Sequence, residues 1–363
     1  MVARGTIATV QALRALGAFG VCIAHLSYEF AHKLGVPDIL PSGIFFGEVG
    51  VDIFFVISGF IIVYSSESLF AERSGAATFL LRRLIRIVPL YWLSSTILLA
   101  WVTVKYGGIG MVQWPWWTLV ADYLFVPVTH PNGSAVPYLG IAWTLLYEMF
   151  FYVVFAAAIG WTGSRTASIA ATAVALLVLI LAGLTFDLPQ PLAYWSNPIT
   201  LEFIYGMLTA VAFRSGLRLD AGRGAALAAL GLAGLLVSEA TLSSSLPTRG
   251  LSLGIPASLI VAAAALSPAP KSAGRTWRFA LFWGEASYAL YLLHPFAITL
   301  PRNLLGSRFD ELAHPYLSAA MMVMLALIIA ASTHLLFEKP MTALLKTAAT
   351  PRLRFLDRQP ATD

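Results

Sequence analysis

The chain has 363 residues, of which 58% are hydrophobic and 11% charged, and its formal net charge is +5. Its mean hydropathy of +0.78 is far too high for a soluble globular protein and predicts an integral membrane protein. A single cysteine, Cys22, excludes an internal disulfide bond and a metal site built from several cysteines, and we expect no bound metal.

Apolar runs of about 20 residues, long enough to cross a bilayer, recur along the chain. They predict an all-α polytopic membrane protein with about ten transmembrane helices. Their approximate ranges are 7–30, 44–65, 84–104, 139–159, 167–186, 195–213, 224–240, 250–266, 278–300 and 315–337. We expect one transmembrane domain over residues 1–341 and a short cytoplasmic tail at 342–363.

The lysines and arginines between these spans are distributed unequally. Most of the 23 lie in connections on the side that also holds both termini. Because cytoplasmic loops are enriched in Lys and Arg, we expect both termini in the cytoplasm. The same bias explains the pI near 9.3, so no nucleic-acid partner is needed to account for it.

The first span contains two ionisable residues, Arg14 and His25. A charged side chain inside a spanning helix costs ~3 kcal/mol or more, so each is a candidate functional residue. Their separation corresponds to about 20° more than three full turns, so both leave one helix face, about 16 Å apart along the axis. The alternative is that Arg14 reaches a lipid headgroup and His25 caps a neighbouring helix.

The second span carries Glu48 near its outer end and Asp52 about one turn deeper, at roughly the level of His25. A carboxylate at that depth would orient the imidazole ring. The other interpretation, which we prefer, is structural: Asp52 hydrogen-bonds a helix end or a serine.

A basic cluster, Arg82–Arg86, directly precedes the third span. Positive charges at this place hold a helix end inside the cell and contact anionic lipid. Arg83 and Arg86 are also three residues apart on one helical face, which suits bidentate binding of a phosphate group. Both interpretations fit the residues.

The longest connection, residues 105–138, is expected outside the cell. It is rich in Trp and Pro and contains Asp122 and His130. Such a segment forms an aromatic belt at the membrane interface, which we prefer, or re-enters the protein as a lid.

Two later spans carry further titratable groups. Glu148 lies about 14 Å below the outer start of the fourth span, where a carboxylate needs a proton or a cationic partner and suits acid–base chemistry. His294 lies in the outer half of the ninth span, and Pro295 beside it is expected to break the helix and free backbone groups for binding.

Six short stretches carry a family resemblance when taken in order. They are Arg14 with His25, Gly50–Gly59, Arg82–Arg86, Trp143–Tyr152, Ser287–His294 and Glu338–Pro340. Together they resemble the acyltransferase family 3 membrane proteins over about residues 7–341. Thr144 stands where the family more often has serine, a minor departure.

The resemblance implies an O-acyltransferase of the bacterial inner membrane with ten spanning helices. Its members move an acyl group, usually acetyl from acyl-CoA, onto hydroxyls of surface or secreted glycans. We therefore expect acyl-CoA as the donor substrate, a saccharide or lipid-linked glycan as the acceptor, the lipid bilayer as surroundings, and no permanently bound cofactor. His25, Glu148 and His294 are the candidate catalytic residues. Arg14, Arg83 and Arg86 are the candidate donor-binding residues.

Two other functions remain possible for a polytopic chain of this kind. A membrane transporter also places charged residues in its bundle, but it predicts related halves, which the sequence does not show. A non-catalytic subunit of a glycan-assembly complex would tolerate loss of His25.

Overall fold

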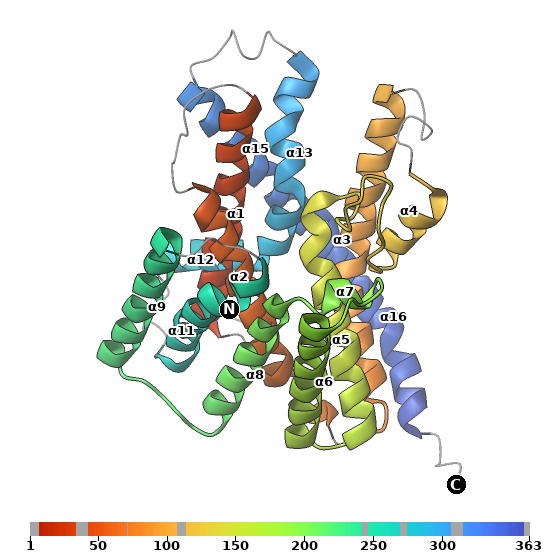
Figure 1. Ribbon diagram of the computed structural model, residues 1–363, viewed down its shortest axis with the longest axis vertical. Coiled ribbons are helices and arrows are strands. Elements are labelled where there is room, and N and C mark those ends of the chain that lie inside the picture. Colours follow the sequence, from red (N-terminus) through yellow and green to blue (C-terminus); the bar gives the residue numbers. More distant parts are fainter. Residues whose placement is uncertain are drawn as a thin grey trace. The chain divides into compact units, whose positions relative to one another are not determined.

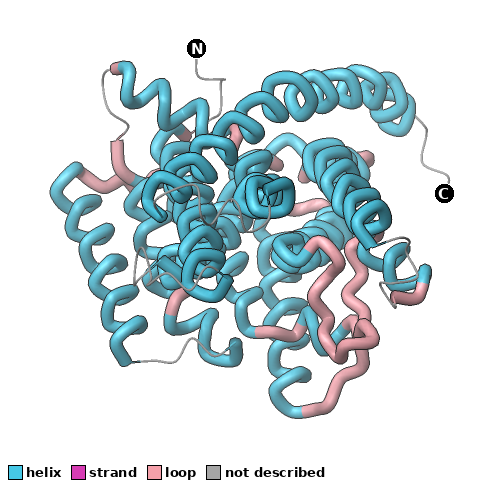
Figure 2. Tube along the Cα trace, turned by 90° about the horizontal axis from the view of Figure 1, so that it is seen from above, coloured by secondary structure: helices cyan, strands magenta, loops and turns pink. Residues whose placement is uncertain are grey.

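A computed structural model describes residues 7–33, 43–70, 72–106, 114–241, 246–268, 274–305 and 315–358. This part of the chain consists of helices and loops and has no β-strand (Figures 1 and 2). Seven of its helical segments are long and apolar enough to cross a membrane. The expected all-α fold with several membrane-crossing helices is confirmed. The count of ten stays a prediction.

The chain forms two compact units. Unit 1 comprises Met1–Ile61 and Leu201–Leu335, and unit 2 comprises Ile62–Thr200 and Leu336–Asp363. Unit 1 is therefore built from two stretches of sequence that are separated by most of unit 2.

Unit 1 is organised around its first helix, α1 (Ala8–Lys33), which packs against four later helices, α11, α12, α13 and α15. In Figure 1, α1 lies in one group with α13 and α15, which also pack on each other, while α9 lies against α11. The helices of this unit after α1 are α2 (Gly43–Ser65, its last turn in unit 2), α8 (Leu201–Arg214), α9 (Ala221–Thr241), α10 (Leu246–Ser252), α11 (Gly254–Leu266), α12 (Arg275–Glu285), α13 (Ser287–Leu305) and α15 (Pro315–Thr333).

The backbones of α2 and α8 touch where two glycines face each other. A Cβ atom added at Gly59 would lie 2.1 Å from the carbonyl oxygen of Phe203, and one at Gly206 would lie 2.0 Å from that of Val56. Any larger residue would push the two helices apart. Contacts between small residues of this kind replace the hydrophobic effect as the source of helix association in lipid.

Unit 2 is a bundle of long helices with shorter pieces between them. Its α3 packs on α5 and on the last helix, α16, while α5 packs on α6 (Figure 1). The bounds of its helices are η1 (Glu67–Leu69), α3 (Gly75–Tyr106), α4 (Trp116–Tyr123), η3 (Gly140–Ala142), α5 (Trp143–Thr162), α6 (Arg165–Thr185), α7 (Leu192–Trp195), η4 (Pro198–Thr200) and α16 (Lys339–Arg358). A π-helix, His334–Glu338, connects α15 to α16.

Several expected spans differ from the helices observed. The third begins at Gly75, earlier than expected, so the basic cluster Arg82–Arg86 lies inside α3. The sixth is interrupted and consists of α7, η4 and α8.

The ninth expected span is broken, but not at Pro295, and that expectation was wrong. The chain stays helical through Pro295 and breaks instead at Ala286, between α12 and α13. Next to this break the chain packs closely on α1: a Cβ atom at Gly284 would lie 2.1 Å from the carbonyl oxygen of Gln11. The hydroxyl of Ser287 also donates a hydrogen bond to the carbonyl of Gly284 at 2.8 Å.

Candidate functional site

Helix α1 carries Arg14 and His25 on one face, as the helical period predicts. Arg14 is half-buried, and its Nη1 lies 3.4 Å from Oε1 of Gln11, one turn earlier. His25 is exposed, in a helix whose neighbouring residues Ala24 and Leu26 are buried. The ring of His25 is therefore accessible to a substrate.

The ring of His25 contacts that of His294, which comes from α13. The two ring centroids are 4.9 Å apart and the ring planes meet at 61°. His294 is fully buried, and Tyr291, one turn earlier on α13, lies beside it at 6.3 Å between ring centroids. The structure thus brings together two of the three expected catalytic residues within unit 1.

Hydrogen bonds to the backbone decide which nitrogen of each ring is basic. Nδ1 of His25 lies 3.0 Å from the carbonyl oxygen of Val21, and Nδ1 of His294 lies 3.0 Å from that of Leu290. A carbonyl oxygen only accepts, so both Nδ1 atoms carry the hydrogen. In the neutral rings the lone pair is on Nε2. Nε2 of His294 is buried and accepts no hydrogen bond from a described residue.

Asp52 does not orient His25 through an ion pair of its own, because its carboxylate is bound elsewhere. Its two oxygens accept from Nε and Nη2 of Arg249, on α10, at 3.0 and 2.9 Å. Both side chains are buried. Asp52 is therefore held structurally, but its partner among the described residues is Arg249 and not the helix end or serine that was expected from the sequence. Glu48 lies in α2, but its side chain is outside the described part of the chain.

A second carboxylate, Glu202 of α8, lies beside this ion pair. It is fully buried, within electrostatic range of Asp52 and Arg249, and neither of its oxygens has a hydrogen-bond partner among the described residues. The first residue of α11 is Gly254, where an added Cβ atom would lie 2.8 Å from Cγ of Glu202. From the sequence alone, neither Glu202 nor Arg249 was given a role.

Glu148, the third expected catalytic residue, belongs to unit 2. It is half-buried on α5 and accepts a short hydrogen bond from the hydroxyl of Tyr152, one turn later. Arg83 of α3 is within electrostatic range of Glu148, which supplies the cationic partner that a carboxylate at this depth requires.

Arg83 is held by its own surroundings. Its Nη2 donates to Oγ of Ser65 at 2.6 Å, and its guanidinium carbon lies 5.5 Å from the ring centroid of Phe79 and 5.7 Å from that of Tyr152. Cation–π contacts of this kind fix the plane of the guanidinium group.

Further cations surround Arg83. Arg82 and Arg86 act on it electrostatically from the same helix, and Lys346 of α16 lies within electrostatic range of all three arginines. The expected donor-binding pair, Arg83 and Arg86, is therefore part of a larger cluster of positive charge. Lys346 was placed in the tail and given no role by the sequence.

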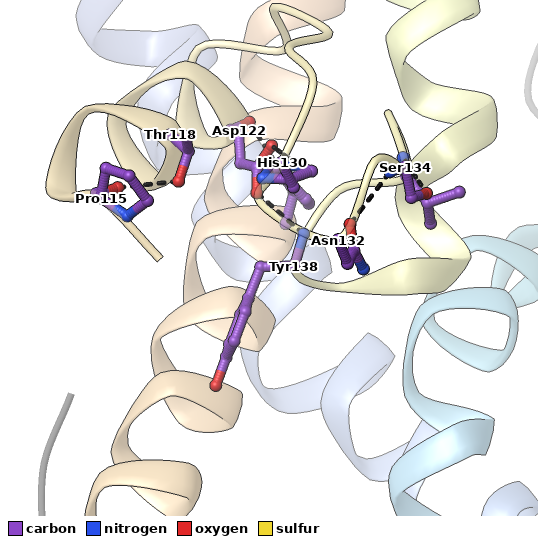
Figure 3. Close-up of polar contacts among 9 residues, drawn as sticks. Pro115, Thr118, Asp122, His130, Asn132, Ser134 and Tyr138 are labelled. Atoms are coloured by element: carbon purple, nitrogen blue, oxygen red, sulfur yellow. Dashed lines mark hydrogen bonds and ion pairs between the residues drawn. The ribbon is translucent and has the colours of Figure 1, made fainter. Parts of the chain in front are cut away.

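The long connection between α3 and α5 contains a buried acid–base pair (Figure 3). Nε2 of His130 lies 3.5 Å from Oδ1 of Asp122, and the other carboxylate oxygen accepts from the backbone N–H of Tyr138 at 2.8 Å. The indole of Trp114 stacks on His130 at 4.0 Å between ring centroids, and the hydroxyl of Tyr91 donates to the carbonyl of Asp122 at 2.8 Å.

Burial shifts both members of this pair toward their neutral forms. It raises the pKa of Asp122 to about 7, although the N–H of Tyr138 opposes this shift. It lowers the pKa of His130 below its ordinary value. The segment is thus packed onto α3 and α4 through specific polar contacts, while Trp116 and Trp117 are exposed as a membrane belt requires.

The described residues contain no group of three or more His, Cys, Asp or Glu side chains that could hold a metal ion. The expected site residues that lie close to one another are His25 with His294 in unit 1 and Glu148 with Arg83 in unit 2.

Comparison with known families matches nearly the whole chain. The model of the family described as "Acyltransferase domain" matches residues 7–333. The exopolysaccharide production protein ExoZ of Rhizobium meliloti (strain 1021) is 32% identical over 258 residues, which cover 70% of this chain and 77% of ExoZ. The acyltransferase MdmB of Streptomyces mycarofaciens is 27% identical over 331 residues, which cover 82% of each chain. No solved structure matches the chain.

Proposed function

Because the chain belongs to the acyltransferase family 3, whose domain model matches residues 7–333, we propose that it moves an acyl group from acyl-CoA to a hydroxyl of a saccharide. Membership of this family identifies the chain as an acyltransferase enzyme. The name of ExoZ supports an exopolysaccharide or related glycan as acceptor. The proposed donor is acetyl-CoA, reached from the cytoplasm.

The observation that carries the proposal is the exposed ring of His25 beside the buried ring of His294. With its hydrogen held on Nδ1 by the carbonyl of Val21, His25 presents the Nε2 lone pair as a base or nucleophile.

The proposed reaction begins with a proton transfer. Nε2 of His25 takes the proton of the acceptor hydroxyl as the hydroxyl oxygen attacks the thioester carbonyl carbon. The carbon–sulfur bond breaks, and the CoA thiolate leaves with the proton returned by His25. The alternative order has His25 take the acyl group first and pass it to the hydroxyl.

His294 and Glu148 are proposed to assist. Nε2 of His294 is unpartnered among the described residues and therefore suits holding or relaying the proton next to His25. Glu148 is proposed to act in acid–base chemistry from unit 2. Arg14, Arg83 and Arg86 are proposed to bind the donor, with its phosphates on the guanidinium groups.

The proposed setting is the bacterial inner membrane, crossed by about ten helices with both termini in the cytoplasm. Lys and Arg counts in the connections support this orientation.

Membrane vesicles that contain the protein, labelled acetyl-CoA and the host's glycan test the proposal. Wild-type vesicles should label the glycan. His25→Asn should lower the rate at least ~100-fold, the minimum expected for loss of a general base. Asn is the matched replacement because its amide N–H still donates to the carbonyl of Val21 as Nδ1 does.

The control is the amount of His25→Asn protein in the membrane, which should equal that of the wild type. Near-normal labelling by this variant would show that the chemistry lies elsewhere. Absence of labelling by the wild type would count against the proposed donor and acceptor.

A further inference from the structure

The last helix brings an additional cation to the arginines of α3. Helix α16 packs on α3, and its Lys346 lies within electrostatic range of Arg82, Arg83 and Arg86. The side chains of Arg82 and Lys346 are exposed, whereas Arg83 is held by Ser65 and two aromatic rings. The cluster therefore has an inner, fixed arginine and outer, accessible cations.

This arrangement leaves excess positive charge in one place. The electrostatic neighbours of Arg83 among the described residues are two arginines, Tyr152 and one carboxylate, Glu148. Four cations close together repel one another. An anion with several charges would relieve this repulsion, so the cluster has the chemistry of a polyphosphate site.

We propose that Lys346 and Arg82 extend the arginine pair into a site for the nucleotide part of the donor, which carries a diphosphate and a separate ribose phosphate. The inference rests on the proposed function and adds two binding residues to it. Guanidinium groups bind phosphate oxygens in pairs, and the ammonium group of Lys346 binds as a point charge on a flexible stem.

A lipid headgroup offers the same chemistry but fits the cluster less well. A phospholipid presents one phosphate at the membrane surface, which one or two cations satisfy. Arg83, by contrast, connects the cluster to Glu148 and Tyr152, so the charges are continuous with groups proposed for catalysis.

Adenosine 3′,5′-bisphosphate, which carries two of the phosphates of CoA, is the probe. The protein is purified into neutral phosphatidylcholine vesicles, and the probe is tested as a competitor of acetyl-CoA. Lys346→Gln should weaken inhibition by the probe and raise the KM for acetyl-CoA by about tenfold each, the lower end for loss of a charged hydrogen bond. The kcat should change less than twofold. Lys346→Arg should restore both constants.

The matched control is Lys105→Gln, which removes the same charge from the last turn of α3. It should leave both constants unchanged. The whole set is repeated in vesicles with anionic phosphatidylglycerol. A difference between Lys346→Gln and wild type that appears only with anionic lipid would assign Lys346 to headgroup binding and overturn the inference.

Two further outcomes separate this inference from the proposed function. Wild-type transfer with unchanged constants in Lys346→Gln would overturn only the role of Lys346. Absence of transfer from acetyl-CoA by the wild type would overturn the proposed donor, whatever Lys346 does.

Discussion

Two histidines of unit 1, His25 and His294, each use one ring nitrogen to bind their own helix, which leaves the other nitrogen of each ring for chemistry. His25 and His294 both donate from Nδ1 to the carbonyl four residues earlier. The rings are thereby fixed in direction, and both Nε2 atoms are basic. They differ in access, because His25 is exposed and His294 is buried. In the proposed mechanism a substrate hydroxyl therefore meets His25, and His294 acts through His25.

The first prediction tests this division of roles. His294→Asn keeps an amide donor for the carbonyl of Leu290 but removes the Nε2 lone pair. We expect kcat to fall by roughly tenfold, less than the general-base range expected for His25→Asn, with the KM for acetyl-CoA unchanged. Steady-state kinetics on purified protein measure both constants. A loss as large as that of His25→Asn would make His294 an equal partner in the chemistry.

At the scale of helices, unit 1 is joined by an ion pair and by touching backbones. Arg249 of α10 holds Asp52 of α2 with two hydrogen bonds, and Glu202 of α8 lies beside them. One arginine offsets one carboxylate, so a second ionised carboxylate would leave an uncompensated charge in this buried place. Three helices thus meet around the pair formed by Asp52 and Arg249.

The second prediction is that Glu202 replaces Asp52 as the counter-ion. Asp52→Asn lets Glu202 ionise beside Arg249, so its cost should be below ~2 kcal/mol. The double variant Asp52→Asn/Glu202→Gln leaves a buried arginine without a carboxylate and should cost about 3–5 kcal/mol. Thermal unfolding midpoints in detergent compare the variants. Glu202→Gln alone is the control and should resemble the wild type. If Asp52→Asn lowers the unfolding midpoint as much as the double variant does, Glu202 does not replace Asp52 as the counter-ion.

The third prediction concerns the connection between α3 and α5. The pKa of Asp122 is raised to about 7, so the stability it contributes is present at acid pH and is lost as the pH rises from about 4 through 7. The pKa of His130 is lowered, so its contribution is present above about 6.5 and is lost as the pH falls below that value. The other titratable groups around the pair, Tyr91 and Tyr138, are phenols that ionise only in alkaline solution.

Two variants isolate these opposing effects. Asp122→Asn leaves His130 alone, so the pH of maximum stability should move upward. His130→Gln leaves Asp122 alone, so it should move downward, and the wild type should lie between them. Limited proteolysis of the connection in membrane vesicles, at a series of pH values, measures the effect. Identical pH dependence in both variants would show that the pair does not control this segment.

At the scale of the whole molecule, the sequence predicts on which side of the membrane each connection lies. The helices of the structure do not test this prediction. Our fourth prediction is that reporters fused at Gly222 and after Asp363 are cytoplasmic. A reporter placed between 105 and 138 should be extracytoplasmic, because the Lys and Arg bias orients the chain. Alkaline phosphatase and green fluorescent protein fusions distinguish the two sides. A reversed result at any one position would break the proposed threading.

The sequence predicted where the helices lie better than where they break or which distant side chains they contact. Long apolar runs specify spanning helices locally, so most spans were found. The break at Ala286 lies beside the contact of Gly284 with Gln11 of another helix, and no local pattern reveals such a contact. Arg249 and Lys346 were missed for the same reason, because their partners lie far away in the sequence. His25 and His294 were found because an ionisable residue in an apolar run is conspicuous.

The ion pair between Asp52 and Arg249 also bears on biosynthesis. Asp52 emerges from the ribosome long before Arg249, and Gly59 long before Gly206, the glycine it meets. During synthesis, α2 is therefore in or beside the membrane before α10 supplies its counter-ion and before α8 supplies its packing partner. An unpaired carboxylate in lipid is costly, so α2 is expected to be less stable in the membrane until α10 brings Arg249 to Asp52. A chain that stops before α10 would expose this unfinished helix to the cell's quality-control proteases.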